Sequence, residues 1–299
     1  MDLLQKFADV EVKGDTRITE ADRDFCQAHQ AAYDNAKSTL SELKFFWEDM
    51  LANQYHLLSS IEAPDTLYLL SGKELKISSE NINETIKAAH STFISQLIYY
   101  FNRTYHISIS PDEIKTALLP KQPEVSHRFD ELKEWNAYGK ALLELSLQYT
   151  DILKQIFIRL DGRNLKEQAM HELLEKCHQA AWESHNKAPR YVLKKAVLQF
   201  STYACSHTDR YSYESWELSE RIKRILQGIA HFETGSFSLI PSKISSLISS
   251  YHLDSDFFEF PTCKKLQSIK LYKNTRVDIR FATEEYARKF TEKYLGTVY

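Results

Sequence analysis

The sequence predicts an α+β protein, mainly α, in which a long-helix bundle is followed by a small antiparallel β-sheet with packed helices. Gly and Pro are scarce, with seven of each in 299 residues, which favours long helices over a turn-rich sandwich. Up to about residue 185 apolar residues recur every three or four positions, as in amphipathic helices. Beyond it, runs of β-branched and aromatic residues indicate strands.

The net charge of -3 conceals an uneven distribution along the chain. Residues 1–185 hold 20 Lys+Arg against 29 Asp+Glu, a balance of -9, and residues 186–299 hold 18 against 12, a balance of +6. We therefore expect two domains, an acidic helical bundle over 1–185 and a basic α+β domain over 186–299 that ends in a β-hairpin and a helix. Such a basic domain suits a polyanionic partner, or docking against the acidic domain.

Helical periodicity predicts the first three elements in order. Thr19 and Asp22 form a near capping box, and the spacing of apolar and small residues over 25–57 predicts one long helix. Apolar side chains over 82–105 share one face and predict a second. The segment SPDE, residues 110–113, has an N-cap, a Pro at the first helical position and the reciprocal acid, so a short third helix should start there.

Two more helices are expected before the composition changes. After the breaker-rich segment 119–126, apolar residues recur over 129–160, which predicts one long helix that stops at Asp161. Asn164 with Glu167 predicts the start of the next helix, which reaches about His185. Helices this long must cover one another's apolar faces, so an antiparallel bundle is the expected packing.

The C-terminal part mixes strands and helices. Residues 190–206 are rich in β-branched and aromatic side chains and are predicted as strand. The periodicity of 214–231 predicts a helix, and 241–253 predicts another. Residues 266–280 predict a β-hairpin, and the helical pattern after it closes the chain.

The hairpin has one favoured register. If Lys273, Asn274 and Thr275 form the loop, apolar residues pair on one face, and the opposite face holds Tyr272 with Arg276, Lys270 with Asp278 and Ser268 with Arg280. On the apolar face Leu271 then pairs with Val277 and Ile269 with Ile279. A two-residue loop would set Leu271 against Asp278, so three residues are favoured, although Thr275 suits the left-handed conformation of such loops poorly.

Basic residues and one tyrosine around this hairpin form the predicted binding site. They are Lys264, Lys265, Lys270, Tyr272, Lys273, Arg276 and Arg280. Together they could hold a nucleic-acid backbone through its phosphates without reading the bases. The alternative is a solvated face, because outward strand positions are often charged and Lys protects hairpin edges against aggregation.

A second constellation lies on the helix that follows Asn164. His171, Glu175 and His178 share one face, and Trp182 and His185 continue the same line. Imidazole and carboxylate groups at this spacing could share a metal ion. Because no second paired motif lies elsewhere, we interpret the line as a packing seam and expect no metal.

Three segments carry a resemblance to a known family. ISSENINETIKAAHSTFISQLIYYFNRTY, WELSERIKRILQGI and LQSIKLYKNTRVDIRFATEEYARKFTEKYL resemble successive blocks of an uncharacterised bacterial family of plasmids, prophages and integrative elements. Some of its members are named methyltransferases, because the domain can lie beside one, and others lie beside toxin genes. The resemblance covers about residues 75–295 and departs at Thr275, where the family pattern has Gly. It implies a mobile-element setting and offers no catalytic residue that can be carried across to this sequence.

Several classes of protein are not expected. The chain has no GxGxxG after a strand, no GxxxxGK[ST], no GxSxG and no usual S-adenosylmethionine-binding elements, so we assign no cofactor and no catalytic residue and favour a non-enzymatic protein. Four widely separated cysteines indicate unpaired thiols in a reducing cytoplasm. No segment approaches the ~18 consecutive apolar residues of a transmembrane helix, so we expect a cytoplasmic protein without a membrane partner.

Three hypotheses of function remain open, and an enzyme with an unfamiliar site is the third of them. The first is a non-enzymatic accessory or regulatory protein of a mobile genetic element that binds nucleic acid through the basic C-terminal sheet face. The alternative is an inhibitor or adaptor that binds a host or defence enzyme through the helical bundle. A continuous basic groove would favour the first hypothesis, and scattered charges would favour the second.

Overall fold

The computed structural model describes residues 17–59, 78–124, 128–183, 188–210 and 213–296. They form an α+β protein, mainly α, with a helical N-terminal part followed by a five-stranded antiparallel sheet with helices, which confirms the predicted fold class. The chain divides into two compact units, Met1–Leu165 and Lys166–Tyr299. No described helix combines the length and the apolar character that crossing a membrane requires.

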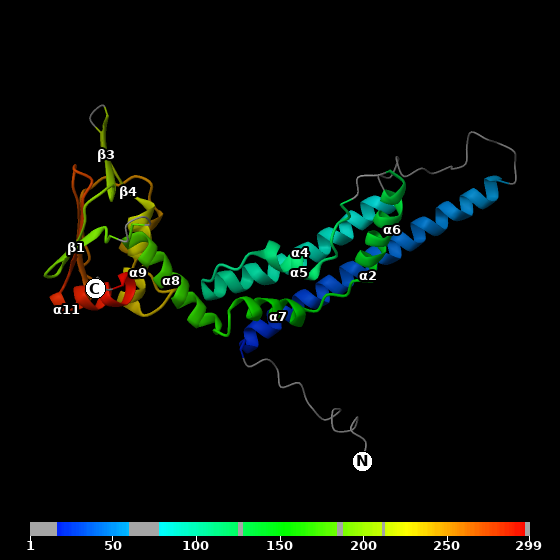
Figure 1. Cartoon of the computed structure of the whole chain (residues 1–299), viewed down its shortest axis with the longest axis horizontal. Helices are drawn as coiled ribbons and strands as arrows, with labels where there is room; N and C mark the ends of the chain where they lie inside the picture. The colour runs from blue at the N-terminus through cyan, green and yellow to red at the C-terminus, as the bar shows by residue number, and fades with distance from the viewer. Residues whose placement is uncertain (1–16, 60–77, 125–127, 184–187, 211–212, 297–299) are drawn as a thin grey trace, which may run out of the picture. The chain divides into compact units, whose positions relative to one another are not determined.

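The first unit is built from helices that pack along one another (Figure 1). Its elements are α2 (Glu20–Ser59), α4 (Ser79–Tyr105), α5 (Pro111–Leu118), α6 (Arg128–Glu144) and α7 (Tyr149–Arg159). Helix α2 packs mainly against α4, and α4 also contacts α5, α6 and α7. Apolar side chains of α4 such as Ile86, Leu97 and Phe101 are completely buried in this unit.

The start of α2 is held by a reciprocal capping box, as the sequence predicts. The Thr19 backbone N–H donates to Asp22 Oδ2 at 2.8 Å, and the Asp22 N–H donates to Thr19 Oγ1 at 3.2 Å. The buried Asp22 carboxylate also accepts from the hydroxyls of Tyr100 and Tyr105 on α4, at 2.9 and 2.6 Å. Although burial opposes it, these hydrogen bonds lower the pKa of Asp22. The cap therefore also fixes α2 against α4.

The expectation of one helix over 129–160 is wrong, because the chain leaves helical conformation at 145–148 between α6 and α7. Gln30 of α2 explains the break. Its Nε2 donates to the Leu147 carbonyl at 3.0 Å, and its Oε1 accepts from the Tyr149 N–H at 2.7 Å. Gln148 and Asp151 then form a capping box for α7. The backbone groups released by the break are thus satisfied by a side chain far away in the sequence.

The second unit combines a five-stranded sheet with helices on one face. Its elements are α8 (Leu165–Ala181), β1 (Tyr191–Lys194), β2 (Val197–Phe200), β3 (Cys205–Arg210), β4 (Tyr213–Leu218), α9 (Glu220–Thr234), α10 (Ser242–Ser249), β5 (Phe257–Glu259), β6 (Leu266–Leu271), β7 (Val277–Phe281), α11 (Glu284–Phe290) and the π-helical turn Thr291–Leu295. The strand order is β1-β2-β7-β6-β5, and β3 and β4 form a separate ribbon. One core joins α8, α9 and α11 to the sheet.

Two predicted helices differ in extent from the structure. The helix predicted over 214–231 is wrong at its start, because residues up to Leu218 form β4 and α9 begins after Ser219. Pairing with β3, in which His207 lies opposite Trp216, overrides the helical pattern there. The Ser219 hydroxyl then accepts from the Ile222 N–H and caps α9. Helix α8 ends at Ala181, before the predicted end near His185.

The division between the units lies at the start of α8, after Leu165, whereas the charge pattern predicted a domain boundary after residue 185. Leu173, Cys177 and Ala181 of α8 belong to the core of the second unit, so the helix is part of that unit. Counted at this division, residues 1–165 hold 18 Lys+Arg against 25 Asp+Glu, a balance of -7, and residues 166–299 hold 20 against 16, a balance of +4. The charge asymmetry is therefore smaller than at residue 185.

The predicted hairpin register is confirmed. Leu271 pairs with Val277, Ile269 with Ile279, Lys270 with Asp278 and Ser268 with Arg280. The Tyr272 N–H donates to the Arg276 carbonyl at 2.9 Å, which leaves a three-residue loop. Thr275 adopts the left-handed conformation, with φ +66°. Its strained backbone is anchored, because its carbonyl accepts from the Ala204 N–H at 3.0 Å and its hydroxyl accepts from the Tyr203 N–H at 3.2 Å.

Candidate functional site

Four of the seven residues predicted to bind nucleic acid share the open face of the sheet. Ile269, Leu271, Val277 and Ile279 are fully buried beneath the helices, so the alternate positions of β6 and β7 project to the other side. These positions and their neighbours at the turn carry Lys270, Tyr272, Arg276 and Arg280. The structure therefore brings these four predicted residues together.

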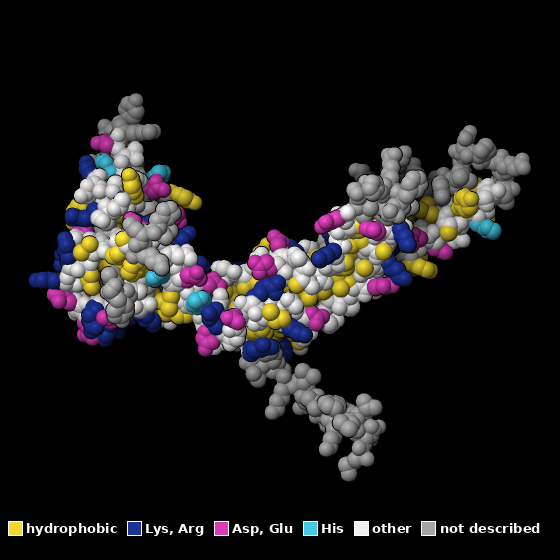
Figure 2. Space-filling model, viewed as in Figure 1, with side chains coloured by type: hydrophobic (Ala, Val, Ile, Leu, Met, Phe, Trp, Pro, Cys, Tyr) yellow, Lys and Arg dark blue, Asp and Glu magenta, His cyan; other side chains and the backbone are white. Residues whose placement is uncertain are grey.

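Carboxylates already compensate two of the cations on this face. Lys270 Nζ lies 2.5 Å from Asp256 Oδ2, and Arg276 Nε lies 3.1 Å from Asp278 Oδ1. The Arg276 guanidinium also lies over the Tyr272 ring, 3.9 Å from its centroid. Figure 2 shows basic and acidic side chains interspersed over the visible face of this unit. Because Asp278 on β7 pairs with Lys270 on β6, a phosphate backbone on the open face would meet carboxylates as well as cations.

Uncompensated positive charge on the open face lies at its β1 side. Arg280 is exposed and has no ion-pair partner among the described residues. Strand pairing sets Val197 opposite both Arg280 and Lys194, and Lys194 is exposed as well. Local sequence patterns do not point to Lys194, because the pairing of β2 with β7 joins segments some eighty residues apart in the chain. Glu259 lies at the other side, on β5.

The remaining predicted residues lie elsewhere. Lys264 and Lys265 precede β6, at the end opposite the hairpin turn, and their backbone N–H groups donate to the Glu233 carboxylate. Lys265 Nζ donates to the carbonyls of Phe232 and Glu233 in the last turn of α9. Both residues thus stabilise the end of α9. Lys273 lies in the exposed turn.

The histidine line on α8 does not converge on a common point. Within the described residues no group of three His, Cys, Asp or Glu side chains is arranged to hold a metal ion. The His178 ring stacks on Trp182 with 5.5 Å between centroids, and the Trp182 indole N–H donates to the Leu295 carbonyl at 2.5 Å. Glu175 accepts from the Gln179 side chain at 3.2 Å. Glu175, His178 and Trp182 therefore make packing contacts or hydrogen bonds within the protein.

The thiols do not form a reactive centre either. All four cysteines are unpaired, and Cys26, Cys177 and Cys205 are buried. Burial raises the pKa of Cys26 and of Cys177 to about 12. Since the thiolate is the nucleophile, these two side chains are inert near neutral pH.

The helical unit presents a second candidate site, an apolar stripe on the C-terminal half of α2. Leu43, Phe46, Met50 and Leu57 lie on one line of the helix, because they are three, four and seven residues apart. Leu43, Phe46 and Leu57 are 42%, 66% and 68% exposed, and Met50 packs partly on the small core around Trp47. We call these four residues the α2 stripe. It runs beside the seam that packs on α4.

Helix α4 packs on the neighbouring side of α2, where Trp47 joins Ile82 and Ile86 in a small core. Helix α4 begins beside Glu48, whose Oε1 accepts from the Ser79 hydroxyl at 2.9 Å. The last turns of α2 therefore run past the ends of α4 and α6, as Figure 1 shows. Glu42 and Asp49, seven residues apart, line the outer edge of the stripe. Isolated exposed apolar residues are ordinary, but a line of them with an acidic edge indicates an interaction surface.

No protein-family model matches this chain, and neither the curated proteins nor the solved structures contain a match. Proposals of function for this chain therefore rest on the geometry, exposure and charge of its own residues.

Proposed function

We propose that this protein is a non-enzymatic accessory or regulatory protein whose helical unit binds a partner protein through the α2 stripe. The observation that carries the proposal is the exposure of Leu43 and Phe46, at 42% and 66%, beside an otherwise packed helix seam. Burying such a side chain contributes roughly 1.5–3 kcal/mol. This function corresponds to an inhibitor or adaptor, and the resemblance to the mobile-element family is compatible with it.

Charge defines the kind of partner. Glu42 and Asp49 line the outer edge of the stripe, and the unit as a whole carries a balance of -7, 18 Lys+Arg against 25 Asp+Glu over residues 1–165. The complementary surface is an amphipathic helix whose apolar residues pack on Leu43 and Phe46 and whose basic residues face the two carboxylates. We therefore assign the stripe to a basic amphipathic helix of another protein.

The test uses a labelled synthetic peptide of three heptads with Leu at positions a and d and Lys at e and g, and a matched peptide with Glu in place of Lys. Fluorescence anisotropy should detect binding of the basic peptide to the full-length protein and weaker binding of the acidic one. The double variant Leu43→Ser/Phe46→Ser should weaken binding of the basic peptide by about tenfold or more.

Phe45 provides a matched control. It is 66% exposed, as Phe46 is, but it points about 100° away from Phe46 around the helix. Phe45→Ser should leave peptide binding unchanged. Equal loss in both variants would indicate a non-specific apolar effect and contradict the proposal. Dimerisation of the wild type in light scattering that disappears in the double variant would assign the stripe to a second copy instead.

Nucleic-acid binding by the second unit is the second candidate function. The observation that favours it is the pair of exposed cations, Lys194 and Arg280, on either side of Val197 on the open face. Both can contact phosphate oxygens without breaking an ion pair seen among the described residues. The two ion pairs at Lys270 and Arg276 are the reason why we rank it second.

A further inference from the structure

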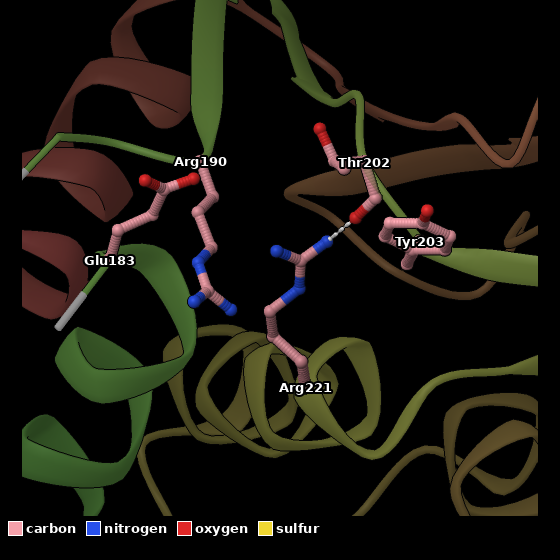
Figure 3. Close-up of a pocket in the computed structure, with 5 residues that line it drawn as sticks. All are labelled: Glu183, Arg190, Thr202, Tyr203 and Arg221. Atoms are coloured by element: carbon pink, nitrogen blue, oxygen red, sulfur yellow. Dashed lines mark hydrogen bonds between the residues drawn. The ribbon is translucent and has the colours of Figure 1, made fainter. Parts of the chain in front are cut away.

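A pocket in the second unit shares no residue with either candidate site. It is lined by Glu183, Arg190, Thr202, Tyr203 and Arg221, and its volume is about 380 Å³. Pockets for small ligands begin at about 300 Å³, so this one has room for a small molecule or for the end of a larger one. Figure 3 shows the guanidinium groups of Arg190 and Arg221 entering the same space from the segment before β1 and from α9.

Neither of the two guanidinium groups forms an ion pair with a carboxylate in the described part of the chain. Arg221 Nη2 donates to the Thr202 carbonyl, which orients it in the pocket. Within the described residues the Arg190 guanidinium has neither a hydrogen bond nor an ion pair, and the Glu183 carboxylate has no ion pair. Burial and the charge of Arg190 lower the pKa of Arg221, against the opposite effect of Glu183. Two positive charges held close together repel each other, so an anion bound between them would be stabilised.

Tyr203 adds an aromatic surface at the rim. Its side chain is 80% exposed, and its backbone adopts the left-handed conformation, with φ +47°. Such a conformation is unfavourable for a residue with a Cβ and persists only when neighbouring contacts hold it. The N–H of Tyr203 donates to the Thr275 hydroxyl in the hairpin turn, which is one such contact. An exposed tyrosine at the edge of a cationic pocket can stack on a ring of the ligand.

We propose that this pocket binds a phosphate monoester, with the phosphate between Arg190 and Arg221 and an attached aromatic ring on Tyr203. Guanidinium groups suit phosphate because their planar N–H donors match its oxygens. The Glu183 carboxylate accepts a hydrogen bond from a hydroxyl of the ligand. A free nucleotide and a phosphorylated end of a nucleic acid offer the same chemistry. The site is independent of the α2 stripe and of the open sheet face.

Differential scanning fluorimetry and calorimetric titration of the full-length protein test the proposal at constant ionic strength with chloride as the reference anion. Adenosine 5′-monophosphate should raise the melting temperature, inorganic phosphate should raise it less, and adenosine should have little effect. Single-stranded DNA with a 5′-phosphate should bind more tightly than the same strand with a 5′-hydroxyl if the source is a nucleic-acid end. Equal affinity of the two strands, with nucleotide binding retained, assigns the pocket to free nucleotides.

The variant Arg190→Gln gives the sharpest readout, because this side chain has no hydrogen bond within the described protein to lose. It should raise the melting temperature of the protein without ligand, since it removes the like-charge contact with Arg221, and weaken nucleotide binding by about tenfold or more. Arg224→Gln removes one charge from the exposed side of α9 and should change neither property. The proposal is overturned if wild type shows no stabilisation by millimolar nucleotide or phosphate, or if the two variants behave alike.

Discussion

The hydroxyl group of Tyr33 on α2 lies 2.7 Å from Nδ1 of His90 on α4. The other ring nitrogen of His90, Nε2, lies 2.9 Å from the Leu142 carbonyl near the end of α6. Because a carbonyl can only accept, Nε2 carries the hydrogen and Nδ1 accepts from the Tyr33 hydroxyl. The Leu147 N–H in turn donates to the same hydroxyl at 3.4 Å. This buried network joins α2, α4 and the break between α6 and α7.

Removing the hydroxyl should destabilise the helical unit. Tyr33→Phe keeps the ring stacked on Phe93, with 4.4 Å between centroids, but leaves Nδ1 of the fully buried His90 without its donor. We expect a loss of about 1–3 kcal/mol in the free energy of unfolding. Denaturant titration monitored by helical circular dichroism measures it. Tyr99→Phe, which alters an exposed tyrosine of α4, should change stability little; an equal loss there would contradict the role of the network.

His90 should also make the helical unit sensitive to acid. Burial lowers the pKa of His90 below its ordinary value of 6.5, because the charged imidazolium is poorly solvated. The unfolded chain therefore takes up the proton first, so the stability contributed by neutral His90 is complete above about pH 6.5 and falls as pH decreases below it. In His90→Gln this pH-dependent component should be absent. Unfolding free energies of both proteins between pH 7.5 and 5.5 give the comparison, and parallel curves would disprove the assignment.

Because α8 packs in the core of the second unit, the chain should yield a stable N-terminal fragment when it is cut before α8 and not when it is cut after it. A fragment that ends at residue 165 should be soluble, helical and monodisperse, because it contains the whole compact helical unit and none of the α8 side chains that belong to the other core. A fragment that ends at residue 185 should bind a hydrophobic dye and aggregate, because Leu173, Cys177 and Ala181 lose the core that buries them. Size-exclusion chromatography of both fragments decides the matter. If the longer fragment is the better behaved one, α8 belongs with the helical unit.

If the open sheet face binds nucleic acid, the affinity should depend on its positive charges and on salt, and not on the base sequence. Changing Lys270, Arg276 and Arg280 to Gln should weaken binding by a similar factor on unrelated sequences, since phosphates rather than bases are contacted. The slope of log affinity against log salt should decrease by about two to three units for duplex DNA. Folding should persist, because Ile269, Leu271, Val277 and Ile279 remain buried on the other face.

Two further measurements separate the outcomes at this face. Adding Lys194→Gln to the triple variant should reduce the slope again, by about one unit, because this residue flanks the same row as Arg280. Absence of binding by the wild type to single- or double-stranded nucleic acid at ~50 mM salt, where phosphate contacts are strongest, would show that the face is only a solvated surface.

Local sequence patterns were sufficient to predict those elements whose stabilising contacts come from residues nearby in the sequence. The Thr19–Asp22 box marks the start of α2, and Pro111 marks the start of α5, because helix ends are satisfied within one turn. The hairpin register followed from the alternation of Ile269 and Leu271 with Lys270, since a shift by one residue would bury a charge. The fold class, set by the change of period near residue 190, followed in the same way.

Tertiary structure decided what depends on residues far apart in the sequence. The break before α7 exists because Gln30 satisfies the backbone at Leu147 and Tyr149, a contact between side chain and main chain that no local pattern encodes. Pairing with β3 converted the start of an apparent helix into β4, because a strand partner satisfies the same backbone groups.

The candidate sites show the same division. The line of Leu43 and Phe46 follows from helical periodicity, but only the packing of α4 on the side of Trp47 left these two side chains exposed. The sequence placed Arg190 and Arg221 thirty-one residues apart, with nothing to connect them. Folding of β1 and α9 around one core brings their guanidinium groups into a single pocket, because packing of the apolar faces determines where the polar ends of these elements meet.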